Sequence, residues 1–384
     1  MMFLDRERIA LYSAFALNGI GIAVWFPRIP DVKAALDLDL LTLSLCFLML
    51  PTGTLVGFAY AAPLIARVGG QRVVAWCGGA FILAFILPAL AWSAGALAIA
   101  LLLTGLAIAP IEVGMNAKAS AFEASRGRRV MTRCHAMWSF GAMAGALVAG
   151  AFADNGVSFL VQQLVLAPPL AAAAVVAGLN LASDRAGVAL ATPRFALPSR
   201  GLLALAALPI GALLLEGAMM EWSALYLQNE VGLSAGRAAA AFAAFSLAMG
   251  VARLLGDSLA TAIGPVRVVR ASSYLACGGL VAFATAFGPI TATAGALLLG
   301  LGVANIYPLA LSMAATEAPA GQVERSIAAL TFAAFSAFLI GPPLIGALAS
   351  VVGLGGALLV LVPLAVYPPT LLKEGIQTSL EAAR

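Results

Sequence analysis

Long stretches without a charged side chain recur along the chain and alternate with short polar segments. In the first half these stretches are 9–27, 40–66, 73–111, 134–153 and 155–183. An α-helix needs about 20 apolar residues to cross the hydrocarbon core of a bilayer. The stretch 73–111 is too long for one such helix, and the segment Trp92-Ser93-Ala94-Gly95 divides it into a hairpin of two. The first half therefore predicts six transmembrane helices.

The second half repeats this scheme. Two spans, 201–228 and 237–261, carry a few charges, and two longer uncharged stretches follow at 271–316 and 326–372. Each of the longer stretches predicts two helices, because glycine and proline break them at Gly288-Pro289 and at 353–356. The sequence thus predicts an all-α membrane protein of twelve transmembrane helices. The expected domains are 1–183 and 201–384, each a six-helix bundle, joined by a central loop at 184–200.

Composition supports this fold class and excludes others. Hydrophobic residues make up 62% of the chain, charged residues only 10%, and the mean hydropathy is +1.03. A soluble enzyme of this length has no way to hide so much apolar surface from water. Disorder is excluded as well, because it requires low hydrophobicity and high charge.

The basic residues indicate an orientation in the membrane. An even number of spans places both termini on one side, and putting them in the cytoplasm leaves 17 basic residues inside and 3 outside. Cytoplasmic loops are enriched in Lys and Arg. We therefore expect a multi-pass protein of a bacterial inner membrane with both termini and the loop 184–200 cytoplasmic. The first span, 9–27, shows no signal-cleavage site and is expected to remain.

The two halves share short matching segments. Leu64 and Gly69, after the second span, recur as Leu259 and Gly264 after the eighth, an offset of 195 residues. The segment Cys77-Gly78-Gly79 recurs at 277–279 with an offset of 200, and a loop difference of five residues would reconcile the two offsets. Matches at about half the chain length indicate duplicated halves.

Together these features resemble the major facilitator superfamily. That resemblance implies two pseudo-symmetric six-helix bundles and secondary transport by alternating access, although the loop Asp typical of the superfamily is absent from both copies. The segment Glu112-Val-Gly-Met-Asn116 is also similar to the fucose permease-like branch of sugar–proton symporters. The acidic residue that this branch carries in its first span is missing here, where Asn18 is the strongly polar side chain.

Acidic side chains inside predicted spans are candidates for proton coupling, because each costs on the order of 3 kcal/mol to insert. They are Glu112, Glu216 and Glu221. Glu112 lies one helical turn from Asn116, on the same face, and is the strongest candidate. Glu216 and Glu221 differ by about 140° around their helix, so they do not both face one cavity. The alternative for Glu112 and Glu216 is a structural carboxylate that pairs with a neighbouring helix. The alternative for Glu221 is a position in the headgroup zone, beside an interfacial Trp222.

Other polar and aromatic side chains in the spans are candidates for substrate binding. Arg253 either binds an anionic group or forms a local ion pair with Asp257, one turn away. Arg28 either snorkels to the interface or contacts substrate at a gate. His135 and Trp138 share one face, and Pro308 predicts a kink beside Asn305 and Tyr307. The full set of candidates is Asn18, Trp25, Arg28, Asn116, His135, Trp138, Trp222, Arg253, Asn305 and Tyr307.

The function predicted from these features is secondary active transport of a small polar solute, most simply by proton-coupled symport. Proton-driven efflux of drugs or metabolites and a non-transporting membrane sensor are the alternatives. The sequence contains no phosphate-binding loop and no nucleophile–base set, so neither enzymatic activity nor a cofactor is expected. One histidine and four scattered cysteines predict no metal site. The expected partners are the solute, protons and the lipid bilayer, without nucleic acid, and the chain is expected to act as a monomer.

Overall fold

The computed structural model describes residues 6–183, 203–318 and 323–364, and the regular structure of these residues is entirely helical. Eleven segments within them are long and apolar enough to cross a membrane. The chain divides into two compact units, which are described separately below. Unit 1 comprises residues 1–192 and 233–243, and unit 2 comprises 193–232 and 244–384.

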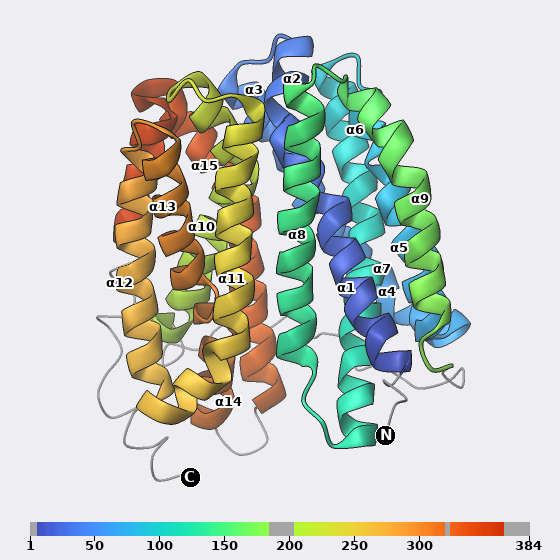
Figure 1. Ribbon diagram of the computed structural model, residues 1–384. Helices are drawn as coiled ribbons and strands as arrows, with labels where there is room; N and C mark the ends of the chain where they lie inside the picture. The colour runs from blue at the N-terminus through green and yellow to red at the C-terminus, as the bar shows by residue number, and fades with distance from the viewer. Residues whose placement is uncertain (1–5, 184–202, 319–322, 365–384) are drawn as a thin grey trace. The chain divides into compact units, whose positions relative to one another are not determined.

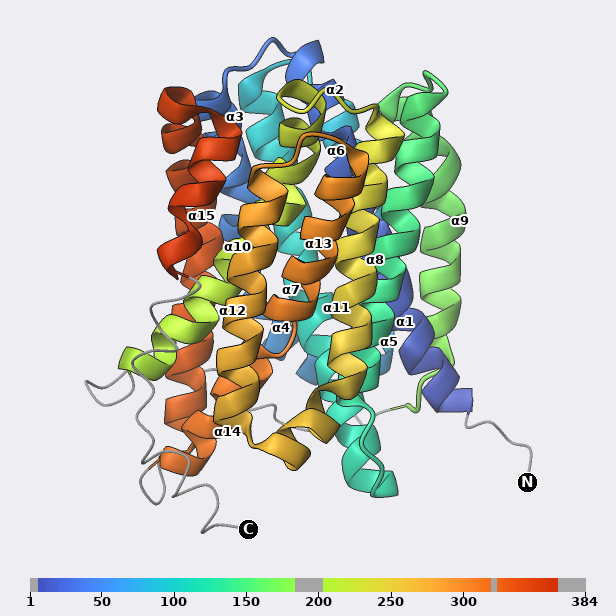
Figure 2. The ribbon, with the colours of Figure 1, turned by 60° about the vertical axis from the view of Figure 1, so that its left-hand side comes forward.

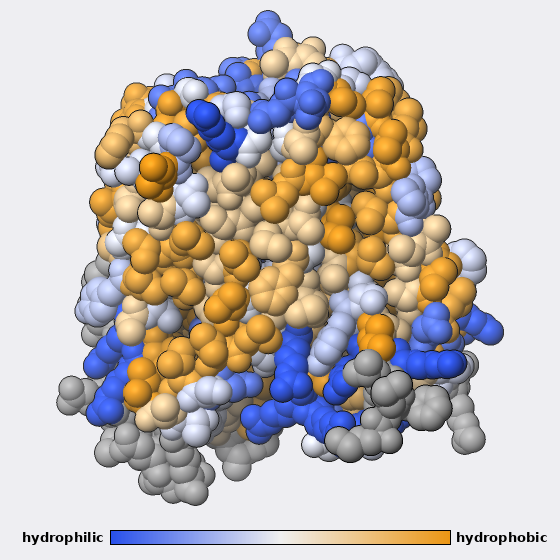
Figure 3. Space-filling model, in the orientation of Figure 1, coloured by the Kyte–Doolittle hydropathy of each residue, from blue (hydrophilic) through white to orange (hydrophobic). Residues whose placement is uncertain are grey.

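Unit 1 consists of long helices that alternate in direction, with short helices at one end (Figure 1). Its elements are α1 (Arg6–Ala23), η1 (Phe26–Arg28), α2 (Ile29–Ala35), α3 (Leu40–Phe47), α4 (Met49–Val68), α5 (Gly70–Ala84), α6 (Ile86–Ala89), α7 (Ala94–Arg126), α8 (Met131–Asp154) and α9 (Phe159–Leu179). On the visible face of this unit, hydrophobic side chains cover the middle of the helices and hydrophilic ones gather at the ends (Figure 3). Large apolar side chains such as Trp76, Ile99 and Val176 are about 60% exposed, as suits contact with lipid.

Polar caps mark where several of these helices begin. The Ser93 hydroxyl accepts a hydrogen bond from the Ala96 amide, 3.2 Å away, at the start of α7. Ser158 caps α9 in the same way through the Val161 amide. Each cap satisfies an amide that has no partner within its helix. The break predicted at 92–95 is therefore confirmed.

Helices α1 and α8 approach each other closely because glycines face the contact. A Cβ atom at Gly141 would lie 2.0 Å from the carbonyl oxygen of Ala16, and one at Gly19 would lie 2.1 Å from that of Trp138. Gly145 approaches Ile20 in a similar way. Small residues at such a crossing allow backbone-to-backbone packing. Residues more than 100 positions apart are thereby joined.

Unit 2 contains the remaining helices. They are α10 (Leu203–Asn229), α11 (Ala235–Ile263), α12 (Pro265–Ala284), α13 (Pro289–Val303), α14 (Ile306–Glu317) and α15 (Val323–Val360), with the first residues of α11 belonging to unit 1. Figure 2 shows α12 and α13 packed side by side, and glycines 279, 295 and 302 lie on their contact. The break predicted at Gly288-Pro289 is present, since α12 ends at Ala284 and α13 begins at Pro289.

A second predicted break lies inside α15. Gly353 has φ 74° and ψ 168°, a backbone conformation that interrupts the helix. The carboxylate of Glu230, at the end of α10, accepts hydrogen bonds from the amides of Leu354 and Gly355 and so caps the segment that follows. The last candidate span, 329–364, includes this break. A twelfth span would need residues beyond 364, which lie outside the described part, as does the loop 184–200. The number twelve therefore stays a prediction.

The loops at Gly69 and Gly264 have the same backbone geometry. Their φ and ψ angles are 88° and 144° for Gly69, and 87° and 146° for Gly264. Each amide donates to the carbonyl four residues earlier, and each carbonyl accepts from the amide four residues later. The next helix begins directly after each glycine, so no loop difference of five residues exists there. The explanation expected for the 277–279 match is wrong: Cys77 lies 8 residues after its loop glycine and Cys277 lies 13.

Candidate functional site

In unit 1, two pairs of the predicted residues are in direct contact. The indole nitrogen of Trp138 on α8 donates a hydrogen bond of 2.8 Å to the side-chain oxygen of Asn18 on α1. On α7, the Asn116 amide donates to Glu112 twice, to the carboxylate at 3.0 Å and to the backbone carbonyl at 2.9 Å. Glu112 and Asn116 therefore share one face of their helix, as their spacing predicts. Whether either pair contacts a solute stays a prediction.

Arg28 does not snorkel to the surface. Its side chain is 3% exposed, and the guanidinium donates to the Val157 carbonyl at 2.7 Å and to the Gln162 side chain at 3.1 Å. It also forms an ion pair with Asp31, one turn away, and lies 5.8 Å from the centre of the Phe159 ring. The interpretation of Arg28 as an interfacial side chain is wrong, because the α8–α9 connection and the first turn of α9 supply acceptors that keep it inside.

Two other candidates in unit 1 pack against aromatic rings. Trp25 is 2% exposed and lies against Phe159, with 5.6 Å between ring centres. His135 meets Phe15 edge-on at 5.3 Å and is half-buried. These contacts place Trp25 in the core of the unit, while His135 keeps part of its surface accessible.

In unit 2, Arg253 of α11 forms an ion pair with Glu216 of α10. The nearest nitrogen and oxygen are 3.6 Å apart, and the side chains are 17% and 11% exposed. Asp257, one turn from Arg253 on α11, is exposed, whereas Glu216 is buried and comes from another helix. The pair joins two charges that are each costly inside a membrane.

Glu221 and Trp222 follow Glu216 on α10. Trp222 is completely buried in unit 2, so it is a core side chain and not an interfacial one. Glu221 is half-buried, and among the described residues it has no hydrogen bond or ion pair. The two glutamates thus differ as their separation around the helix predicts, since Glu216 meets a cation and Glu221 does not.

The predicted interruption near Pro308 is also present. Helix α13 ends at Val303 and α14 begins at Ile306, with Asn305 between them. The Asn305 amide donates to the Ala252 carbonyl of α11 at 2.9 Å, and its side chain is buried. Tyr307 lies 3.5 Å from the Thr331 hydroxyl. This hydrogen bond joins α11 to the break between α13 and α14, and it uses one of the two N–H donors of the Asn305 side chain.

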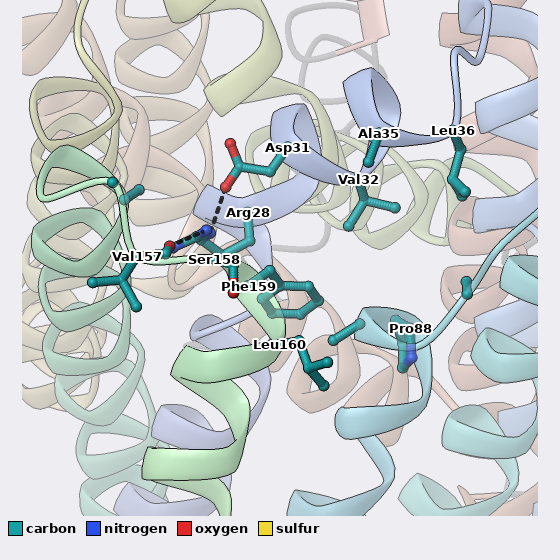
Figure 4. A pocket seen from close by; sticks show the side chains of 14 residues that line it. Arg28, Asp31, Val32, Ala35, Leu36, Pro88, Val157, Ser158, Phe159 and Leu160 are labelled. Atoms are coloured by element: carbon teal, nitrogen blue, oxygen red, sulfur yellow. Dashed lines mark hydrogen bonds and ion pairs between the residues drawn. The ribbon is translucent and has the colours of Figure 1, made fainter.

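A cavity of about 400 Å³ lies at one end of unit 1, beside Arg28 (Figure 4). It is bounded by α2, by the end of α6 and by the connection from α8 to α9. The sequence did not point to it, because its walls come from three separated segments. Its lining residues are Arg28, Asp31, Val32, Ala35, Leu36, Pro88, Ala89, Ala91, Ala153, Gly156, Val157, Ser158, Phe159 and Leu160.

Apolar helices of membrane-spanning length define a multi-pass membrane protein, and charged side chains inside such helices are candidates for function. Its relatives show that this membrane protein is a transporter. An uncharacterized transporter of Sinorhizobium fredii, y4wD, is 32% identical over 350 residues, which cover 88% of this chain and 89% of the relative. An uncharacterized MFS-type transporter of Yersinia pestis is 28% identical over 351 residues, 91% of each chain. The chain belongs to this family of MFS-type transporters and is a transporter, not an enzyme.

Further comparisons agree with this assignment. The membrane protein MosC of Rhizobium meliloti is 30% identical over 366 residues, which cover 93% of this chain and 87% of MosC. Crystal structures of the nucleoside transporter NupG share the fold: a point mutant aligns over 97% of this chain and 99% of its own with a TM-score of 0.73, and a second structure gives 0.67 over 98% of each. Both are 14% identical, so this likeness concerns the fold alone. No family model matches the chain.

Proposed function

We propose that this transporter couples inward movement of a small polar solute to inward movement of protons by alternating access, and that Glu112 carries the proton. The observation that carries the proposal is the pair of Glu112 and Asn116 on α7. A carboxylate that carries a proton alternates between a charged and a neutral form. A useful partner must bind both forms.

An amide meets this requirement and a guanidinium does not. The side chain of Asn116 offers donors to the charged carboxylate and an oxygen that accepts from the protonated one. Arg253 offers only donors, so a proton on Glu216 would remove the negative charge that faces this guanidinium. Glu112 is therefore better suited to load and release protons, while Glu216 is suited to hold Arg253.

The orientation proposed for this cycle has both termini and the loop 184–200 in the cytoplasm. The excess of basic residues on that side supports it. A cysteine placed at Ser199 in a cysteine-free variant should resist an impermeant thiol reagent in intact cells. Efficient labelling would reverse the orientation.

The coupling proposal is tested in proteoliposomes. The solute is first found by thermal stabilisation of the purified protein against a library that includes sugars and nucleosides, because a ligand that binds the folded state raises its stability. Glu112→Gln, which mimics the protonated form, should still exchange labelled solute across the membrane. It should lose accumulation driven by a pH gradient.

Asp37→Asn is the matched control, because Asp37 is an exposed acid on the loop after α2. It should accumulate solute as the unmodified protein does. Full gradient-driven accumulation by Glu112→Gln would remove Glu112 as the coupling site. If the unmodified protein accumulates solute only when the pH gradient is reversed, the result would favour efflux over uptake.

A further inference from the structure

We infer that the cavity beside Arg28 is a binding site for small organic cations that carry an apolar body. Its residues all belong to unit 1, and none of them is among the carboxylates proposed for coupling. A volume of about 400 Å³ falls within the range of small-molecule sites. The inference rests on the distribution of charge and apolar surface along the walls.

The polar end of the cavity presents a carboxylate with spare capacity. The three nitrogens of Arg28 already face Gln162, the Val157 carbonyl and Asp31, so its positive charge is paired within the protein. Asp31 uses one oxygen in the ion pair and is 42% exposed, and Figure 4 shows its other oxygen turned away from Arg28. A carboxylate oxygen accepts several hydrogen bonds, so an ammonium group has a ready partner.

The C-terminal end of α8 also favours a positively charged ligand in this cavity. This 24-residue helix ends at Asp154, and both Ala153 and Gly156 line the cavity. The carbonyl end of a helix carries partial negative charge and favours cations. The start of α9 also borders the cavity, but Ser158 caps it by accepting from the Val161 amide. The carbonyls of Phe152 and Ala153 already accept from the amides of Val157 and Gly156, so the helix end acts through its partial charge and Asp31 supplies the hydrogen-bond acceptor.

The opposite end of the cavity is apolar. Val32 of α2 and Leu36, directly after α2, face Pro88 of α6 and Leu160 of α9 across it (Figure 4). These side chains offer no hydrogen bonds and gain from covering a hydrocarbon group. A ligand that matches both ends has an ammonium head and a short aromatic or aliphatic body.

The test uses three probes of one shape: phenethylammonium, 2-phenylethanol and 3-phenylpropionate. Each is titrated against the full chain in phosphatidylcholine nanodiscs, with thermal unfolding as the readout. Phenethylammonium should raise the Tm in a saturable way, and the neutral and anionic probes should not. Equal effects of all three, or a preference for the anion, would overturn the inference.

Two variants with matched controls locate the site. Ala35→Trp fills the cavity from α2, whereas Ala34→Trp changes the neighbouring exposed residue, which does not line it. Asp31→Asn removes the carboxylate, and Asp37→Asn removes an exposed acid nearby. Both cavity variants should weaken the apparent affinity for phenethylammonium at least about tenfold, the effect of losing a charged hydrogen bond or the space for the body. The controls should not change it.

Asp31→Asn leaves Arg28 without its counter-charge, so a loss of stability is expected beside the loss of binding. Ala35→Trp leaves the ion pair of Arg28 and Asp31 untouched, so this variant alone tests whether the cation binds in the cavity. Unchanged binding by a folded Ala35→Trp protein would place the cation elsewhere. This result is independent of the coupling test, because solute accumulation is not measured.

Discussion

The two units share the backbone geometry of one loop glycine, but the carboxylates inside their helices have different partners. Gly69 in unit 1 and Gly264 in unit 2 have φ and ψ angles within 2° of each other. Glu112 in unit 1 accepts a hydrogen bond from the Asn116 side chain of its own helix, whereas Glu216 in unit 2 pairs with Arg253 of another helix. Loop geometry is thus repeated while side-chain chemistry is not. The comparison suggests that unit 1 carries the exchangeable proton and unit 2 a fixed pair of charges.

The largest effect that sharpens this comparison is expected from Arg253→Met. The variant leaves Glu216 as a buried charge without its cation, and breaking such a pair typically costs about 3–5 kcal/mol. The loss should appear in the free energy of unfolding in mixed micelles. The double variant Arg253→Met/Glu216→Gln removes both charges and should recover most of the loss. No recovery would mean that Arg253 acts mainly through other contacts.

A smaller effect is expected from replacing either loop glycine. Gly69→Ala and Gly264→Ala force a side chain into a backbone region that only glycine adopts easily, at about 1–3 kcal/mol each. Chemical denaturation of the two variants should give similar losses. Gly278→Ala is the control, because this helical glycine has open space around its Cβ position and alanine favours helix. Clearly unequal losses of unfolding free energy for Gly69→Ala and Gly264→Ala would show that the two loops are not equivalent.

The smallest effect is expected from Asn116→Ala. It removes the hydrogen bonds to Glu112 on a half-buried face, so the free energy of unfolding should fall by only about 1 kcal/mol. Asn116→Asp would place a second acid beside Glu112 and should reduce stability more at high pH than at low pH. A loss from Asn116→Ala as large as that from Arg253→Met would contradict the proposed difference between the units.

Helix boundaries were predictable because local residues determine them. Ser93 caps α7, Gly288-Pro289 opens α13 and Gly353 interrupts α15, and each signal is contained in a few neighbouring residues. The pair of Glu112 and Asn116 was predictable for the same reason, since a spacing of four puts two side chains on one face.

Contacts between helices were not predictable in this way. The partner of Arg253 depends on how α10 and α11 are rotated about their axes, which the spacing within either helix does not reveal. The hydrogen-bond acceptors that keep Arg28 inside, on Val157 and Gln162, lie more than 100 residues away, so the sequence around it resembles that of an interfacial arginine. The match at 277–279 misled because identical residues fell on different turns of their helices.

The burial of Arg28 has a consequence for biosynthesis. Its acceptors, Val157 and Gln162, follow it by 129 and 134 residues. At a translation rate of about 5–20 residues per second, they emerge from the ribosome roughly 6 to 27 seconds after the arginine does. During that interval the first candidate span, 6–35, carries a cation whose distant acceptors do not yet exist, with Asp31 as its nearby counter-charge. Nascent chains cut short before α9 should therefore be retained by the insertion machinery or degraded, while longer ones are released into the bilayer.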